Sequence, residues 1–249
     1  MRKKRMPWVE PAESGPSSFE WGGCVAYLKD CRKHSWPQRC DVLVFDPPWD
    51  DRDAWNVDVS DFGACLAFCD GKYAGEAVKR FGPPRWVFVW DTMSTWSSSS
   101  SAPLNGCKLC LLFGDAPWNR DEALYGEPPP SKKHPSTQYS PLSGRRLSDL
   151  YRKSLRWQSN ASASGASDKP PHAKPDEWVR ALVCGVGVRG GLLCDPFMGG
   201  GASLVAATSA GMSEIATELN PSVFHWTRKR LADSRESHRE QMSLFSGDQ

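Results

Sequence analysis

The sequence predicts an α/β protein whose mostly parallel, twisted sheet carries helices on both faces. Three observations lead to this prediction. Short apolar runs containing β-branched residues alternate with longer helix-like segments along the chain. Two of these runs end in an acid followed by proline, at Asp46-Pro47 and at Asp195-Pro196. The second run is followed by a glycine-rich stretch and a helix-like segment, an arrangement typical of nucleotide-binding α/β proteins.

Composition sets the broad class. The chain has 249 residues, of which 39% are hydrophobic and 24% charged, as in a globular protein with one substantial core and room for a smaller insert. No stretch approaches the roughly 18 apolar residues of a membrane span, and the first residues lack a signal-peptide core. We therefore expect a cytoplasmic protein that does not bind membranes.

Cysteine usage agrees with that expectation. The nine cysteines are expected to be reduced thiols, since their number is odd and no secretory signal is seen. Cys107 and Cys110 have the spacing of zinc ligands, but no second pair follows at a suitable distance. Cys65 and Cys69 lie four residues apart within a predicted helix. We expect no metal.

The first half of the chain contains the following predicted elements. A basic arm over 1–18, rich in Pro, Ser and Gly further along, precedes the regular structure. The apolar patterns then predict helices over 22–33 and 61–80, and strands over 42–45, 85–90 and 108–113. An acidic loop over 50–53 follows the first strand, and a serine run over 97–101 reads as another loop.

The second half resumes regular patterning after a long polar stretch. Helices are predicted over 176–188, over 202–210 and from Pro221 to about Glu240, with strands over 192–195 and 213–217. Between 128 and 171 only one short helix, around 147–157, shows an apolar pattern.

This polar stretch is strongly basic. From Pro128 to Lys174 there are nine Lys or Arg residues against two acids, a net charge of +7, whereas the whole chain carries only +2. Four aromatic residues lie in it or beside it: Tyr125, Tyr139, Tyr151 and Trp157. Positive charge interleaved with aromatic rings suits contact with the backbone and bases of nucleic acid. The alternative is a solvated basic loop.

The first candidate site is the turn after the strand over 42–45. Asp46, Pro47, Pro48 and Trp49 follow the strand directly. Both prolines fix their own φ and lack an N–H, so the carboxylate and the indole are held on a stiff turn. Such a turn could hold a flat ring against Trp49 while Asp46 accepts hydrogen bonds from an amino group. Alternatively, the prolines merely end the strand and Trp49 packs.

The second candidate site runs from Asp195 to Asn220. It comprises a strand, a glycine-rich turn, a helix, a second strand and the acid Glu218. Glycines allow a ligand to approach the backbone, and an acid after the next strand can bind the hydroxyls of a ribose. Leu204 stands where the dinucleotide fingerprint has its third glycine, and Asp195 is a poor neighbour for a pyrophosphate. The pattern therefore favours a cationic nucleoside such as S-adenosylmethionine over NAD.

Taken together, these motifs resemble those of S-adenosylmethionine-dependent DNA amino-methyltransferases, which methylate exocyclic amines of adenine or cytosine. Asp46-Pro-Pro-Trp49 resembles their catalytic tetrapeptide, Asp195-Pro-Phe-Met-Gly-Gly-Gly201 their cofactor loop, and Glu218-Leu-Asn-Pro221 their ribose-binding acid. His172-Ala-Lys-Pro175 is similar to the signature that precedes the loop, and Gly23-Cys24 to the opening element. The catalytic tetrapeptide precedes the cofactor loop, as in the circularly permuted β-class.

The resemblance implies a Rossmann-like methyltransferase fold and assigns roles to individual residues. The implied catalytic residues are Asp46, Pro47, Pro48 and Trp49. The implied S-adenosylmethionine-binding residues are Cys24, Asp46, Lys174, Asp195, Pro196, Phe197, Gly199, Gly201, Ser203, Glu218, Leu219 and Asn220. Cys24 stands where the family usually has an acid. Lys174 is expected either to contact the carboxylate of the cofactor or to be solvated, and His172 to make local hydrogen bonds.

The implied activity is methyl transfer to the N6 amine of adenine in double-stranded DNA, with the base flipped out of the helix. An aspartate-first tetrapeptide is more typical of adenine enzymes than of N4-cytosine enzymes, which remain the alternative. Carbon-5 methylation requires a cysteine nucleophile, and the sequence has no Pro-Cys pair. An RNA adenine methyltransferase and a non-catalytic DNA-binding module are the less favoured alternatives.

The expected organisation has five parts. A flexible arm (1–18) is followed by the catalytic half (19–125), a basic target-recognition region (126–170), the cofactor-binding half (171–240) and a flexible tail (241–249). In the tail, Gln241-Met-Ser-Leu-Phe245 resembles the pentapeptide with which bacterial proteins dock on the replication sliding clamp. We therefore expect a nucleoid-associated bacterial or phage protein, monomeric or homodimeric.

Overall fold

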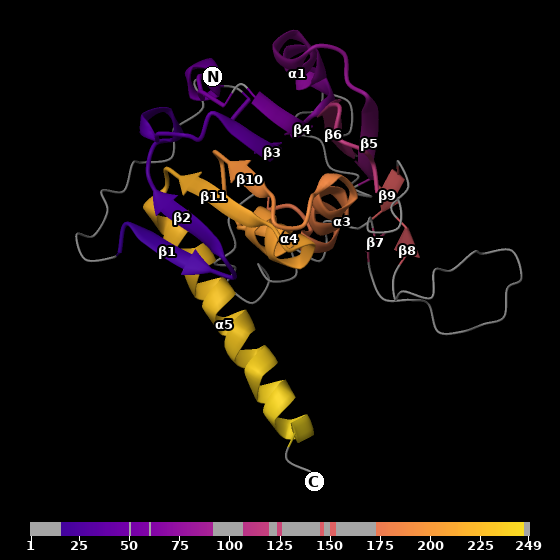
Figure 1. The fold of residues 1–249 in the computed structure, drawn as a ribbon. Coiled ribbons are helices and arrows are strands. Elements are labelled where there is room, and N and C mark those ends of the chain that lie inside the picture. The colour runs from indigo at the N-terminus through magenta and orange to yellow at the C-terminus, as the bar shows by residue number, and fades with distance from the viewer. Residues whose placement is uncertain are drawn as a thin grey trace, which may run out of the picture.

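The structure is a computed structural model that describes residues 16–49, 51–59, 61–91, 107–119 and 173–246, and three short strands between 124 and 152. Of those short strands and of 235–246 only the backbone is described. Nine strands form one sheet in the order β1-β2-β11-β10-β3-β4-β6-β5-β9 (Figure 1). Their bounds are β1 Ser18–Trp21, β2 Cys24–Leu28, β3 Arg39–Phe45, β4 Asp61–Cys69, β5 Trp86–Asp91, β6 Cys107–Gly114, β9 Leu150–Arg152, β10 Leu192–Asp195 and β11 Ser213–Glu218.

Further segments complete the regular structure around this sheet. The helices are α1 Ala74–Phe81, α3 Asp176–Val186, α4 Ala202–Ala210 and α5 Pro221–Ser246. Short 3₁₀ turns are η1 Cys31–Lys33, η2 Arg52–Trp55 and η3 Gly71–Tyr73, and β7 Leu124–Tyr125 pairs with β8 Arg145–Arg146 apart from the main sheet. Among the described residues, no helix combines the length and the apolar character needed to cross a membrane.

The sheet is mostly parallel. From β2 through β11, β10 and β3 to β4, every neighbouring pair is parallel. β6 runs antiparallel between β4 and β5, which restores the common direction in β5. Strands far apart in sequence are thus direct neighbours, and β3 from the first half lies beside β10 from the second. Because the parallel strands point the same way, their carboxyl ends meet along one edge.

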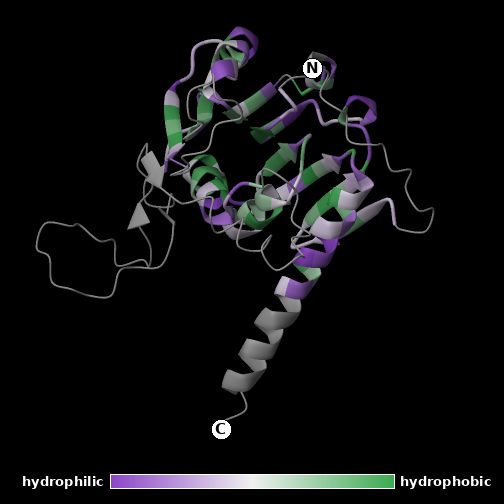
Figure 2. Cartoon of the chain, turned by 180° about the vertical axis from the view of Figure 1, so that it is seen from behind, coloured by the Kyte–Doolittle hydropathy of each residue, from purple (hydrophilic) through white to green (hydrophobic). Residues whose placement is uncertain are grey.

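Both faces of the sheet are covered by apolar side chains. Val42 and Val44 of β3 belong to the core under α3, α4 and the start of α5, whereas Leu43 and Phe45 face the core under α1 and the 3₁₀ turns. In Figure 2 the inner strands of the sheet are largely green, whereas much purple lies on α1 and on the start of α5. This alternation confirms the predicted architecture of a mostly parallel sheet with helices on both faces.

Most predicted elements agree with the structure. The strands expected over 42–45, 85–90, 108–113, 192–195 and 213–217 correspond to β3, β5, β6, β10 and β11, and the helices over 176–188 and 202–210 correspond to α3 and α4. All nine cysteines lie among the described residues and are thiols. The helix expected around 147–157 and most of the basic region lie outside the described residues.

Two predicted helices are wrong in part. The segment 22–33 forms β2 and η1, because Gly22 and Gly23 adopt positive φ and make a tight turn from β1 into β2. The segment 61–80 begins as β4 and becomes helical only at η3 and α1. Consecutive residues Ala64, Cys65, Leu66 and Ala67 are fully buried, so this segment is an internal strand covered on both faces, and Cys65 and Cys69 lie on a strand.

The last helix is longer than predicted. It was expected to end near Glu240, but α5 continues to Ser246 and includes the segment 241–245 that was expected to belong to a flexible tail. The sequence between Arg228 and Ser246 has neither glycine nor proline, so nothing in it ends a helix earlier.

Candidate active site

Three predicted acids end three neighbouring strands. Asp46 follows β3 directly, Asp195 is the last residue of β10 and Glu218 is the last residue of β11. Since the order is β11-β10-β3, all three carboxylates lie along the same edge of the sheet. The fold therefore joins the two motif groups, which are almost 150 residues apart in sequence, into one candidate site.

Asp46 has a cationic partner in this structure. Its carboxylate forms an ion pair with the ammonium of Lys174, which comes from the segment before α3. The Lys174 Nζ also lies 4.9 Å from the centroid of the Phe68 ring. Lys174 is therefore packed over an aromatic ring and paired with the predicted catalytic acid, which neither of the two roles expected for it anticipated.

Trp49 packs inside the protein. The indole is 8% exposed, and its Nε1 donates a hydrogen bond of 2.6 Å to the Phe68 carbonyl. The ring lies edge-on to Trp55, with centroids 5.0 Å apart, and parallel to Tyr73 within 18°, with centroids 6.1 Å apart. Stacking of a base on Trp49 would require its separation from Tyr73. In this structure Trp49 packs beside the turn, and its stacking on a target base stays a prediction.

The prolines of the turn differ in environment. Pro47 is buried, whereas Pro48 is exposed and its carbonyl accepts a hydrogen bond of 2.8 Å from the Asp51 N–H. This bond closes a tight turn immediately after Asp46. The carboxylate is consequently fixed between a strand and a stiff turn, as the sequence predicted.

Hydrogen bonds to Asp195 and Pro196 anchor the start of the glycine-rich loop. Asp195 is 2% exposed, and its Oδ1 accepts a hydrogen bond of 2.9 Å from the Phe197 N–H. The Pro196 carbonyl accepts a bond of 2.8 Å from the Thr217 hydroxyl on β11. Phe197 packs edge-on against Phe45, with ring centroids 5.4 Å apart, and so links the loop to the strand that carries Asp46.

Two glycines of the loop have a backbone that disfavours side chains. Gly199 and Gly201 have φ values of 51° and 73°. The Gly199 carbonyl accepts a hydrogen bond of 2.7 Å from the Thr227 hydroxyl of α5. The loop therefore leaves β10, packs on α5 and begins α4 at Gly201.

We expect Gly201→Ala to lower the free energy of unfolding more than Gly199→Ala does. A Cβ at Gly201 would lie 2.6 Å from the Thr227 Cγ2, whereas a Cβ at Gly199 would meet nothing nearer than 3.7 Å. Both variants incur the cost of a left-handed backbone, about 1–2 kcal/mol, and only the first adds a clash. Urea denaturation should show a loss of about 3 kcal/mol for Gly201→Ala and about half of that for Gly199→Ala. Equal losses would contradict this account of the loop.

Glu218 is oriented by backbone donors on both sides. Its Oε2 accepts a hydrogen bond of 2.9 Å from the Gly199 N–H, and its Oε1 one of 2.8 Å from the Asn220 N–H. Burial raises the pKa of the Glu218 carboxyl, and these N–H donors oppose the rise. Each oxygen keeps lone pairs for further donors, so the carboxylate is prepared to bind hydroxyl groups.

The two residues after Glu218 have different roles. Leu219 is 51% exposed and presents an apolar surface beside the carboxylate. Asn220 begins α5, because its Oδ1 accepts hydrogen bonds from the backbone N–H groups of Ser222 (3.0 Å) and Val223 (3.4 Å). Its side chain is therefore engaged in capping the helix.

Two of the predicted cofactor contacts lie away from the edge. Cys24 is at the start of β2, in register with Glu214 rather than with Glu218, and is 1% exposed. Ser203 is 2% exposed and faces the sheet from α4. Both were assigned by matching motif positions, and both side chains are buried. Ser203 lies beside the buried carboxyls of Asp195 and Glu214.

Burial makes Asp195 a weak acid. It raises the pKa of this carboxyl to about 7, and the neighbouring Asp46 acts in the same direction. Because the folded-state pKa is above the ordinary value near 4, this group stabilises the fold fully below about pH 4 and loses that contribution as the pH rises to about 7. Asp195→Asn keeps an oxygen for the Phe197 N–H but does not titrate.

We therefore expect the stability of Asp195→Asn relative to wild type to increase with pH. Between pH 5 and pH 7.5 the difference in free energy of unfolding should move in favour of the variant by about 2 kcal/mol. Urea denaturation of both proteins at the two pH values measures this difference. A difference that does not change with pH would show that Asp195 titrates in its ordinary range.

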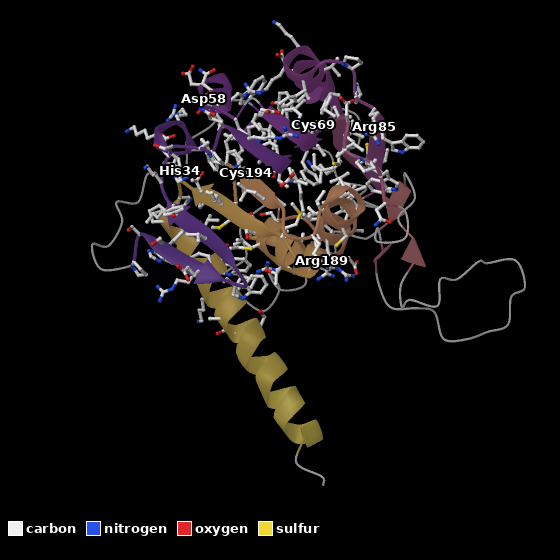
Figure 3. All side chains as sticks on the ribbon, viewed as in Figure 1. His34, Asp58, Cys69, Arg85, Arg189 and Cys194 are labelled. Atoms are coloured by element: carbon white, nitrogen blue, oxygen red, sulfur yellow. The ribbon has the colours of Figure 1, made fainter. Side chains whose placement is uncertain are left out.

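Cys69, at the end of β4, is a buried cysteine close to Asp70 and Asp46. Burial raises the pKa of its thiol to about 12, and Asp70 and Asp46 add to the rise. Figure 3 shows Cys69 and Cys194 on the sheet, in contrast to Arg85 and Arg189 at the periphery. Cys69 is accordingly a neutral thiol at pH 7, which does not suit a nucleophile.

Sequence reasoning missed other charged residues at the same edge. Asp30 follows β2 and pairs with Arg32 at 2.6 Å, and Asp70 follows β4 and pairs with Lys108. The signal available in the sequence is an acid within two residues of the end of an apolar run, as at Asp30 and Asp70. Tyr73, the parallel neighbour of Trp49, had no sequence signal that separated it from a core residue.

Several predicted features lie outside the described residues. These are His172, the arm up to residue 15, most of the region 126–170, and the side chains of Gln241–Phe245. Among the residues described, no group of three or more His, Cys, Asp or Glu is arranged to hold a metal ion.

Comparison with solved structures identifies the fold. No protein-family model and no curated protein sequence matches the chain. The PvuII DNA methyltransferase (cytosine-N4-specific) superposes with a TM-score of 0.58 at 12% identity, covering 85% of this chain and 90% of that one. A putative DNA modification methylase from Thermus thermophilus, complexed with S-adenosyl-L-methionine, gives 0.52 at 15% identity, covering 84% and 94%. The predicted Rossmann-like methyltransferase fold is thereby confirmed.

Proposed function

We propose that this chain is a DNA methyltransferase that transfers a methyl group from S-adenosylmethionine to the N6 amine of adenine in duplex DNA. The observation that carries the proposal is the convergence, on neighbouring strands, of Asp46 on its Pro-Pro turn with the Asp195 loop and Glu218. These are the chemical groups needed to bind an amine and a nucleoside side by side. The PvuII enzyme, which has the same fold, is a DNA methyltransferase by its own description.

The residues at the edge fit the proposed cofactor. Glu218, oriented by the Gly199 and Asn220 N–H groups, would bind the ribose hydroxyls. The open backbone at Gly199 allows a ligand to approach the loop, and exposed Leu219 offers an apolar surface for a purine ring. Buried Asp195 would act through the loop that it holds. When bound, the cofactor supplies an electrophilic methyl group on a sulfonium.

Asp46 would act on the target amine. The lone pair of an exocyclic amine is delocalised into the ring, which makes it a weak nucleophile. A carboxylate that accepts hydrogen bonds from the amine, together with the Pro47 carbonyl, favours the pyramidal nitrogen with a localised lone pair. The same carboxylate stabilises the positive charge that develops on the nitrogen. Its fixed position on the turn supplies alignment.

The remaining parts of the chain would bring DNA to this edge. The target base must leave the helix to reach Asp46. The basic region 126–170 would contact phosphates, which predicts affinity that falls steeply with salt. Trp49 would support the turn, and it would stack on the base only after moving away from Tyr73.

The identity of the target base is the more specific part of the proposal. The aspartate-first tetrapeptide supports adenine, whereas the PvuII enzyme is described as specific for cytosine N4. Tritiated S-adenosylmethionine should therefore be incubated with unmethylated genomic DNA, and the digested nucleosides analysed by mass spectrometry. N6-methyladenine is the expected product, and single-molecule sequencing of the same DNA would locate the site.

Other outcomes separate the alternatives. N4-methylcytosine would preserve the mechanism and change the base. Label in RNA but not in DNA would overturn the substrate. Binding of S-adenosylhomocysteine without methyl transfer to either would favour a non-catalytic DNA-binding module.

The segment Gln241–Phe245 supports a second, separate partner. We propose that it docks on the bacterial sliding clamp, which would suit a nucleoid-associated enzyme that acts behind replication. Because the backbone there is helical, docking would require the end of α5 to unwind. Removal of residues 241–249 should abolish binding to immobilised clamp and leave methylation of free DNA unchanged. Undiminished clamp binding would refute the assignment.

A further inference from the structure

We infer that Lys174 is a positioning residue that exchanges carboxylate partners: it pairs with Asp46 in the free protein and with the carboxylate of the cofactor in the loaded protein. The exchange would free Asp46 for the target amine only after the cofactor has bound. This inference rests on the proposed function and concerns the order of events at the same site.

The first observation is the pairing itself. The Lys174 ammonium occupies Oδ2 of Asp46, and the exposed fractions of the two side chains are 16% and 36%. The ammonium also lies over the Phe68 ring, so the cation has two partners inside the protein. An amine that approaches Asp46 must therefore compete with a charged group that is already in place.

The second observation is the position of the Lys174 backbone beside the cofactor loop. A Cβ built on Gly200 would lie 3.4 Å from the Cβ of Ala173, so the segment that carries Lys174 packs directly on the glycine-rich loop. Lysine has a flexible four-carbon stem and three rotatable donors. From this one backbone position, its ammonium can be directed to Asp46 or toward a group bound at the loop.

Charge supplies the reason for the exchange. The target nitrogen becomes positive during methyl transfer, and an ammonium that remains on Asp46 would oppose that charge. The sulfonium of the cofactor adds a second cation at the edge. The cofactor also brings one carboxylate, which needs a cationic partner. Arg32 and Lys108 at the same edge already pair with Asp30 and Asp70. We therefore assign the incoming carboxylate to Lys174.

The test compares two ligands that differ only in the carboxylate. Calorimetry would measure the affinities of S-adenosylhomocysteine and of its decarboxylated analogue, 5′-(3-aminopropylthio)-5′-deoxyadenosine, for wild type, Lys174→Met and Lys174→Arg. Loss of the carboxylate should weaken binding to wild type at least tenfold and to Lys174→Met less than twofold. Lys174→Arg should behave like wild type. Lys79→Met, at an exposed position of α1, is the matched control.

A second readout follows the release of Asp46. A duplex carrying 2-aminopurine immediately beside the target adenine, which keeps its N6 amine, reports extrusion of that adenine by fluorescence. With wild type the signal should rise only when S-adenosylhomocysteine is present, whereas Lys174→Met should give most of the rise without it. Lys174→Arg should restore the dependence on cofactor.

The outcomes separate this inference from the proposed function. If wild type and Lys174→Met lose the same affinity on decarboxylation, the exchange of partners is refuted while methyl transfer stands. If wild type binds S-adenosylhomocysteine but shows the same 2-aminopurine signal with and without it, the ordering is refuted. If wild type does not bind S-adenosylhomocysteine, the proposed function itself fails. Thermal melting of each variant checks that it is folded.

Discussion

Asp46→Ala is expected to lower the rate of methyl transfer about 10²–10³-fold while leaving the affinity for S-adenosylhomocysteine within about threefold of wild type. The substitution removes the proposed acceptor for the amine hydrogens and the negative charge that stabilises the developing cation. Removal of one such preorganised group typically costs a factor of about 10²–10³. Single-turnover incorporation of tritiated methyl groups into DNA measures the rate, and calorimetry measures the affinity.

Two companion variants make this result specific. Asp58→Ala removes an exposed aspartate from the loop after η2 and should leave both quantities unchanged. Asp46→Asn retains an oxygen acceptor without the charge, so its rate should lie between those of wild type and Asp46→Ala. A rate for Asp46→Ala close to that of wild type would remove Asp46 from the reaction.

Glu218→Gln is expected to weaken S-adenosylhomocysteine binding about 100-fold. Both oxygens of Glu218 accept backbone N–H groups, whereas an amide would turn its NH₂ toward one of these donors. The side chain would therefore lose its orientation as well as its charge. Two charge-assisted hydrogen bonds to hydroxyls contribute about 3 kcal/mol, which corresponds to about two powers of ten in affinity.

A ligand that lacks one hydroxyl tests the assignment directly. The 2′-deoxy analogue of S-adenosylhomocysteine should bind wild type more weakly than the parent compound, while Glu218→Gln should discriminate little between the two. Glu20→Gln, on the exposed side of β1, serves as the control for charge and should behave like wild type. Equal discrimination by wild type and Glu218→Gln would move the ribose away from this acid.

The sequence predicted best those elements that are clearly bounded. β10, α4 and β11 were placed within a residue, because an acid and proline, a glycine run and a second acid mark their ends. The same markers identified Asp46, Asp195 and Glu218 as candidates. Their meeting at one edge followed from the rule that parallel strands end together, which requires no knowledge of side-chain contacts.

Prediction failed where burial removes periodicity or the partner is distant. β4 is apolar on both faces and lacks β-branched residues, so its pattern fits a buried helix as well as a strand. β2 is defined by pairing with β11, 190 residues later, and no local signal reports that partner. Such contacts are properties of the fold rather than of the segment.

Side-chain direction was equally unavailable from the sequence. The pairing of Lys174 with Asp46 spans 128 positions. The sequence left open whether Trp49 stacks on a base or packs, and only the structure shows that its indole N–H donates to the Phe68 carbonyl inside the aromatic cluster. Cys24 and Ser203 match positions of a motif, and the structure buries both side chains. A motif therefore located the region of the site but not how deeply each of its side chains is buried.

The acidic residues at the ends of the strands also affect release of the demethylated product. The strands β2, β11, β10, β3, β4 and β5 each end at, or within two residues of, an acid: Asp30, Glu218, Asp195, Asp46, Asp70 and Asp91. Arginine or lysine pairs with Asp30, Asp70 and Asp46. For the proposed reaction, S-adenosylmethionine arrives with a net charge of +1, whereas the demethylated product is neutral. The negative potential at this edge would therefore bind the cationic methyl donor more strongly than the neutral product, which favours turnover over product inhibition.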